Sequence, residues 1–268
     1  MTPRRASAPH RAGIEPMKIL LTNDDGINAD GIRAFKNALM EIGDVIVVAP
    51  EAEMSAVGHS ITLSDPLRVR EVRHNGQLFG MAVNGTPADC VKIAVRAILP
   101  EPPDMVISGI NHGQNVATNI IYSGTVSAAT EGTILGIPSV AVSLASFTGG
   151  DFSVAAEYSI RIIKQVAARK LPPDTLVNVN VPAVSADQVQ GIKVCRMGMS
   201  KFTEVFERRV DPRDRDYYWQ GGHMEMSPQD METDIYWLSR NWVTVTPIHY
   251  DLTDHKLMGA MLKWGFSG

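Results

Sequence analysis

The sequence predicts an α/β fold in which a mostly parallel sheet carries helices on both of its faces. Short apolar runs rich in β-branched residues recur along the chain, and segments with helical spacing lie between them. Strands that are buried on both faces have this apolar pattern, and parallel strands need a crossover connection that is usually a helix. The length of 268 residues is enough for one such domain with a smaller appendage.

The predicted elements follow one another in the order that this fold requires. The first strand, 18–22, runs into the polar turn Asn23-Asp24-Asp25-Gly26, and a helix over 32–42 follows it. Two alternating segments within 66–83 flank Asn75-Gly76, a dipeptide that favours a tight turn, so we expect an inserted β-hairpin there. Further strands are predicted at 44–50, 105–108, 139–143, 176–181 and 242–246, and a terminal helix at 254–264.

Composition excludes several classes of protein. The formal charge of -4 argues against a nucleic-acid partner, and no apolar run approaches the ~18 residues of a membrane span, so we expect no membrane partner either. Two cysteines, Cys90 and Cys195, are too few for a disulfide framework and indicate a reducing compartment, which predicts a cytoplasmic protein. Residues 1–16 are basic and lack the apolar segment of a secretory signal, so they are predicted to be a disordered tail.

The last part of the chain has a different character from the rest. Residues 200–240 are rich in charged and aromatic side chains but show no periodicity that would build a core. We therefore expect residues 17–190 to form the core domain. Residues 191–268 are expected to be an extension that packs on a partner chain.

Polar side chains gather at the ends of three predicted strands. They are Asn23, Asp24 and Asp25 after the first, Glu51, Glu53 and Ser55 after the second, and Ser108, Asn111 and Asn115 after the third. Because ligands bind outside the carboxyl ends of the strands in an open α/β sheet, we expect these side chains to converge. Adjacent Asp24 and Asp25 would repel each other, and oxygen donors without His or Cys favour Mg²⁺, Mn²⁺ or Ca²⁺. A polar turn that caps a helix is the alternative interpretation of Asp24 and Asp25.

A second candidate site is the start of the helix that follows Tyr122. Ser123 and Thr125 place hydroxyl groups at a helix N-terminus, where N–H groups and the helix dipole bind anions, although an ordinary N-cap remains open. A carboxylate-held metal beside an anion site indicates phosphoryl transfer or hydrolysis. His59 is left open, either as a donor to phosphate or an acid, or as a structural loop residue.

The chain lacks the motifs of several other phosphate-handling and hydrolytic enzymes. It has no P-loop, no dinucleotide-binding glycine motif after the first strand, no H-E-x-x-H and no G-x-S-x-G. Asn23 stands where aspartyl-phosphate phosphatases place their nucleophilic Asp, so attack by a metal-activated water is favoured over a covalent intermediate. Either Asp24 or Asp25 would then orient or deprotonate that water.

The same segments resemble the SurE family of metal-dependent nucleotidases. The resemblance lies in Leu21–Ile27, Pro50–Thr62, Asn84–Val91, Ser108–Asn115 and Tyr122–Val126. It implies a Rossmann-like core, one divalent cation (Mg²⁺ or Mn²⁺) and hydrolysis of nucleoside 5'-monophosphates, sometimes of 3'-monophosphates or short polyphosphate. By motif position it implies metal ligands at Asp24, Asp25, Ser55 and Asn111, and a phosphate site at Asn115, Ser123, Gly124 and Thr125.

The resemblance also bears on assembly and on the rival functions. It implies a homodimer or homotetramer in which the C-terminal segments are exchanged between subunits. Ala56 is a departure, because many members have Gly there, and it is expected to alter the flexibility of the loop. Two rival functions are a metal-dependent enzyme of the glycosyltransferase type that acts on sugar nucleotides, and a nucleotide sensor without catalysis.

Overall fold

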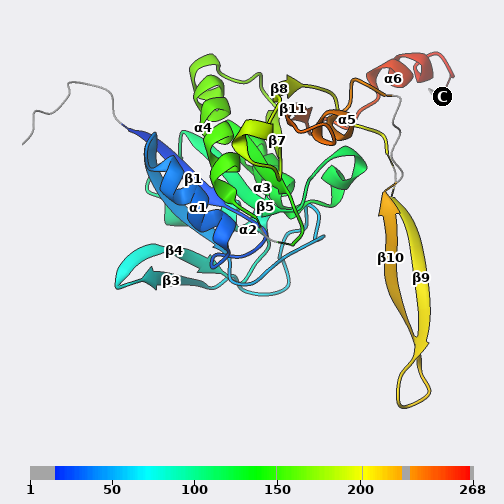
Figure 1. Cartoon of the computed structure of the whole chain (residues 1–268), viewed down its shortest axis with the longest axis horizontal. Helices are drawn as coiled ribbons and strands as arrows, with labels where there is room; N and C mark the ends of the chain where they lie inside the picture. The colour runs from blue at the N-terminus through cyan, green and yellow to red at the C-terminus, as the bar shows by residue number, and fades with distance from the viewer. Residues whose placement is uncertain (1–15, 149, 201, 225–229, 266–268) are drawn as a thin grey trace, which may run out of the picture.

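The structure, a computed structural model, describes residues 16–148, 150–200, 202–224 and 230–265 (Figure 1). Its main sheet contains β1 (Met17–Thr22), β2 (Gly43–Pro50), β3 (Val69–His74), β4 (Gln77–Val83), β5 (Met105–His112), β6 (Ser139–Ala145), β7 (Thr175–Pro182), β8 (Gly191–Val194) and β11 (Trp242–His249). The nine strands lie in the order β3-β4-β2-β1-β5-β6-β7-β11-β8. Only the β3–β4 and β7–β11 pairs are antiparallel within this sheet. The predicted mostly parallel α/β fold is confirmed.

Helices cover both faces of the sheet, as predicted. They are α1 (Asp30–Leu39), α2 (Pro87–Ile93), α3 (Gly124–Ile134), α4 (Phe152–Arg169), α5 (Asp234–Leu238) and α6 (His255–Met261), with a π-helix, η1 (Ala94–Ile98), and two short 3₁₀ helices, η2 (Ala117–Tyr122) and η3 (Ala186–Gln188). Helices α1 and α4 pack together on one face, and α2 and α3 pack together on the other (Figure 1).

The central strands are apolar throughout because each of their faces meets a helix layer. In β1, Ile19 and Leu21 belong to the core under α1 and α4, whereas Leu20, between them, belongs to the core under α2. Successive side chains of a strand point to opposite faces, so both faces of this strand are buried. Full burial of each such side chain contributes about 1.5–3 kcal/mol relative to exposure.

The inserted hairpin is confirmed as β3 and β4, which turn at Asn75 and Gly76, both with positive φ. Strand β4 then pairs with β2 in parallel, so the hairpin extends the main sheet. Helix α4 and the strands of a second hairpin, β9 (Phe202–Val210) and β10 (Asp216–Met224), are not among the predicted elements. The described side chains of β9 and β10 are largely exposed, so these strands lack the alternation of a half-buried strand.

The segment 191–268 contributes to two parts of the molecule. Strands β8 and β11 pair with each other, and β11 continues the main sheet from β7. The β9–β10 hairpin forms a separate two-stranded sheet that projects away from the body (Figure 1). The predicted tail, 1–16, lies outside the described residues except for Pro16. No helix in the described part of the chain has the length and apolar character needed to cross a bilayer.

Candidate metal and phosphate site

A pocket of about 750 Å³ lies where β1, β2 and β5 reach their carboxyl ends. Its lining residues include Asp24, Asp25, Glu53, Ser55, Ala56, Asn111, His112, Asn115, Asn119, Tyr122, Ser123, Phe147, Glu204 and Gln220. Six of the predicted site residues therefore share one pocket. Gly124 and Thr125 are not among the lining residues, although they follow Ser123 directly.

Gly124 and Thr125 instead contact Asp24 at the start of α3. The Thr125 hydroxyl donates to Asp24 Oδ1 at 2.6 Å, and Thr125 itself is fully buried. A Cβ at Gly124 would lie only 2.8 Å from the Cβ of Asp24, so glycine allows α3 to begin against this carboxylate. The helix expected to bind phosphate thus also fixes an acidic residue at the end of β1.

The described lining of the pocket contains no Lys or Arg to pair with the two aspartates, and His112 is the basic side chain that acts on Asp25. Burial, together with the negative charge of the neighbouring Asp25, raises the pKa of Asp24 to about 6, although the hydrogen bond from Thr125 lowers it. Burial also raises the pKa of Asp25, although the backbone N–H of His112 donates to its Oδ2 at 3.1 Å. The described lining residues include four carboxylates and neither Lys nor Arg. A bound cation would neutralise part of this negative charge.

The remaining candidate ligands also offer oxygen atoms. The Ser55 hydroxyl donates to Glu53 Oε1 at 2.5 Å, which leaves its lone pairs for a cation. The Asn111 amide nitrogen donates to Gly113 O at 2.7 Å, so the amide oxygen is the atom that could ligate a cation. No three His, Cys, Asp or Glu side chains among the described residues are grouped to hold a metal. The donor set therefore fits a hard cation bound by mixed carboxylate, hydroxyl and amide oxygens.

The loop after β2 brings Ser55 to the pocket through backbone hydrogen bonds. Met54 N donates to Asp24 O at 2.8 Å, and Gly58 N donates to Tyr122 O at 3.0 Å. Ala56, between them, has a φ of 57°, in the left-handed region where a side chain costs about 1–2 kcal/mol more than glycine. This backbone conformation is the physical reason that glycine suits position 56.

Buried amides that were not predicted from the sequence hold Asn115. Its backbone N–H donates to Asn180 Oδ1 at 2.8 Å, and its carbonyl accepts from Asn178 Nδ2 at 2.8 Å and from Asn180 Nδ2 at 3.0 Å. Its own side chain donates to Ser143 Oγ at 2.8 Å. The sequence does carry a sign of this network, since two asparagines alternate with valines in β7. Asparagines in a buried strand need hydrogen-bond partners nearby.

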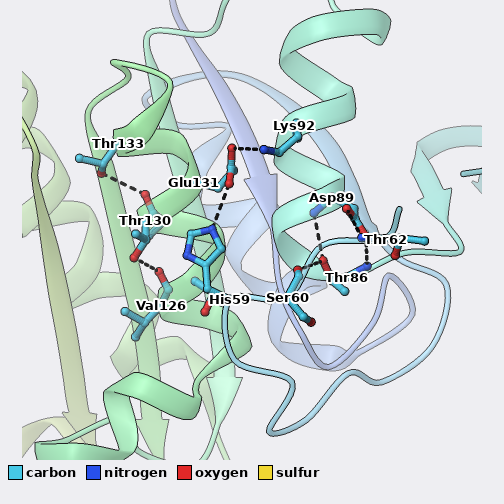
Figure 2. Close-up of polar contacts among 12 residues, drawn as sticks. His59, Ser60, Thr62, Thr86, Asp89, Lys92, Val126, Thr130, Glu131 and Thr133 are labelled. Carbon is cyan, nitrogen blue, oxygen red and sulfur yellow. Dashed lines mark hydrogen bonds and ion pairs between the residues drawn. The ribbon is translucent and has the colours of Figure 1, made fainter. Parts of the chain in front are cut away.

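His59 is not among the residues that line the pocket. Its Nε2 lies 3.0 Å from Oε2 of Glu131 on α3, and Lys92 Nζ of α2 lies 3.0 Å from the other oxygen of the same carboxylate (Figure 2). Of the two roles left open for this histidine, the geometry matches the structural one. His112 contributes its backbone N–H to Asp25, as described above.

The chain is similar to known proteins over most of its length. Residues 19–204 match the family model described as Survival protein SurE. A 5'-nucleotidase SurE from Syntrophobacter fumaroxidans is 53% identical over 248 residues, which are 92% of this chain and 99% of that protein. One from Heliobacterium modesticaldum is 47% identical, with 92% of each protein covered. The crystal structure of the SurE protein from Aquifex aeolicus has a TM-score of 0.80 and 41% identity, covering 91% of this chain and 97% of that one.

Proposed function

This chain belongs to the SurE family, and from that premise we propose that it hydrolyses nucleoside 5'-monophosphates in the pocket at the carboxyl edge of its sheet. It is a metal-dependent nucleotidase, and the glycosyltransferase and sensor alternatives are not favoured. The observation that carries the choice of pocket is the pair of acidic side chains, Asp24 and Asp25, beside the start of α3. This arrangement combines a cation site with an anion site, as phosphate-ester hydrolysis requires.

The metal ligands that we propose are Asp24, Asp25, Ser55 and Asn111. One Mg²⁺ or Mn²⁺ there would neutralise phosphate charge and make the attacking water more acidic. Either Asp24 or Asp25 orients that water or accepts its proton. The Thr125 hydroxyl keeps the Asp24 carboxylate in place through its 2.6 Å hydrogen bond.

The phosphate group is assigned to the opposite wall of the pocket. Ser123 is the N-cap of α3, and its Oγ accepts from Val126 N, so the hydroxyl proton remains to be donated to a phosphoryl oxygen. The side chain of Asn115 and the backbone N–H groups of Gly124 and Thr125 would add further partial positive charge around the phosphate. Donors fixed in this way stabilise the charge that develops during hydrolysis.

We also propose a homodimer or homotetramer assembled through exchange of residues 191–268, with 17–190 as the catalytic core. Large apolar side chains are exposed on the β9–β10 hairpin and on α6, among them Phe206, Tyr218, Trp219 and Leu257. Burial of this apolar surface against another subunit would stabilise the assembly. Cys90 and Cys195 are both free and buried, which supports a cytoplasmic location.

A phosphate-release assay tests the function. The full chain is treated with EDTA and assayed with AMP, GMP, CMP, UMP, 3'-AMP, short polyphosphate and a sugar nucleotide, with and without Mn²⁺ or Mg²⁺. We expect phosphate release from 5'-monophosphates only when the cation is restored. Turnover of the sugar nucleotide without phosphate release from AMP would support the glycosyltransferase alternative, and nucleotide binding without turnover would support the sensor.

A further inference from the structure

Glu131 is a buried carboxylate at which three segments of the chain meet. It projects from α3, and only 3% of its side chain is exposed. The His59 ring reaches it from the loop after β2, and Lys92 reaches it from α2 (Figure 2). The cluster therefore joins the loop that carries Ser55 to the helix whose first turn faces the pocket.

The cluster is poorly explained as a source of stability alone. Removal of a carboxylate from water costs several kcal/mol, and a buried ion pair often contributes no more than an apolar replacement of the same volume. Although burial of Glu131 opposes its ionisation, the contacts with His59 and Lys92 hold its pKa below the usual range. The carboxylate is thus kept charged, and it gives His59 a fixed partner.

The position of Ser55 depends on how this loop is anchored. Ser55 itself is exposed, and His59 follows it by four residues. After His59, Ser60 O accepts from the Thr86 hydroxyl at 2.8 Å, and Thr62 N donates to Asp89 Oδ1 at 3.0 Å (Figure 2). Those two contacts attach the loop to α2. The backbone hydrogen bond from Gly58 N to Tyr122 O holds the loop beside the start of α3, and the His59–Glu131 contact adds a side-chain attachment to the body of that helix.

We propose that His59 and Glu131 are positioning residues for the metal site. Their contact holds the loop against α3, so that the Ser55 oxygen on the loop and the phosphate donors at the start of α3 keep a fixed separation. Lys92 neutralises the same carboxylate but lies outside the loop, and it is not part of the positioning contact. This inference rests on the proposed function, since it assigns a role around the proposed cation.

The difference between His59 and Lys92 provides the test. Mn²⁺ affinity is measured by calorimetry on the full chain without substrate, for the native protein and for His59→Leu, His59→Gln and Lys92→Met. Thermal unfolding is recorded for each protein. We expect His59→Leu to weaken Mn²⁺ binding about 10-fold, at the lower end of the 10–100-fold that loss of a residue supporting a metal ligand causes. Hydrogen exchange of residues 51–60 should become faster in the same variant.

The controls separate positioning from stability. Lys92→Met should lower the unfolding temperature but leave Mn²⁺ affinity within about 2-fold, at the edge of what calorimetry resolves. His59→Gln should restore affinity, because its amide nitrogen can occupy the place of Nε2. If His59→Leu does not fold, His59→Asn replaces it, since its shorter amide cannot reach Glu131.

Two results would overturn the inference. One is native Mn²⁺ affinity in the His59 variants that cannot contact Glu131, and the other is an equal loss of affinity in Lys92→Met. A native chain that binds Mn²⁺ but releases no phosphate from nucleotides contradicts the proposed function and leaves this inference standing. A native chain that binds no Mn²⁺ contradicts both.

Discussion

Helix α3 has a buried acidic site at its N-terminal end and another near its middle, and the two are built in opposite ways. At the N-terminal end, Asp24 and Asp25 lie together, and the pKa of each is raised by burial. Farther along the helix, Glu131 is as deeply buried as Asp24, but contacts with His59 and Lys92 lower its pKa. Burial is common to both sites, so the difference comes from the partners that the protein supplies.

The two acidic sites differ in whether the chain itself supplies their counter-charges. The described lining of the pocket has no Lys or Arg beside Asp24 and Asp25, and its one basic side chain, His112, does not prevent burial from raising the pKa of Asp25, so a cation from solution would have charge to neutralise there. Glu131 has its counter-charges within the chain and offers little to an external ion. A buried carboxylate therefore indicates a metal site only when the chain provides no basic side chain to balance its charge.

The largest effect is expected from Asp25→Asn. Loss of one carboxylate halves the negative charge of the aspartate pair, so metal-dependent phosphate release should fall by at least about 100-fold, the upper end of what loss of a supporting residue causes. AMP hydrolysis with Mn²⁺ titrated from low to high concentration measures this loss. Asp30→Asn is the matched control, because Asp30 is exposed on α1 and should leave activity unchanged. Near-native activity of Asp25→Asn would remove Asp25 from the proposed ligands.

A smaller effect is expected from Thr125→Val. The substitution keeps the shape of the side chain but removes the hydrogen bond to Asp24 Oδ1, so Mn²⁺ affinity should fall about 10-fold. Calorimetry with Mn²⁺ measures it. Thr130→Val is the control on the same helix, because the Thr130 hydroxyl donates to Val126 O and not to the site. Equal affinities of the two variants would show that the contact with Asp24 does not matter for the cation.

The smallest effect is expected at Glu131 and concerns stability against pH. Because its folded-state pKa lies below the unfolded value of about 4.5, its ion pairs stabilise the fold above that pH and are lost as pH falls through the folded pKa. The stability difference between the native protein and Glu131→Gln should be about 1 kcal/mol near neutral pH, as for partly exposed ion pairs, and shrink in acid. Urea unfolding between pH 3 and 7 measures it. A difference that grows as pH falls contradicts the assigned direction.

The central strands of the main sheet could be predicted from the sequence, whereas the exposed strands β9 and β10 could not. The strands around β1 are recognisable because apolar runs end in polar residues, and those endings locate the pocket. The direction of the Thr125 side chain was not predictable, since it depends on how closely α3 approaches Asp24, which Gly124 decides in space. The support of Asn115 by Asn178 and Asn180 likewise requires the spatial placement of β7.

The outer wall of the pocket has a different origin from its floor. Glu204 and Gln220 reach the pocket from the β9–β10 hairpin, whereas Asp24 and Asp25 follow the buried strand β1. Substitutions that reshape the hairpin would therefore change which molecules fit in the pocket and leave the two aspartates in place. The shape of the outer wall and the placement of the acidic pair thus depend on separate parts of this chain.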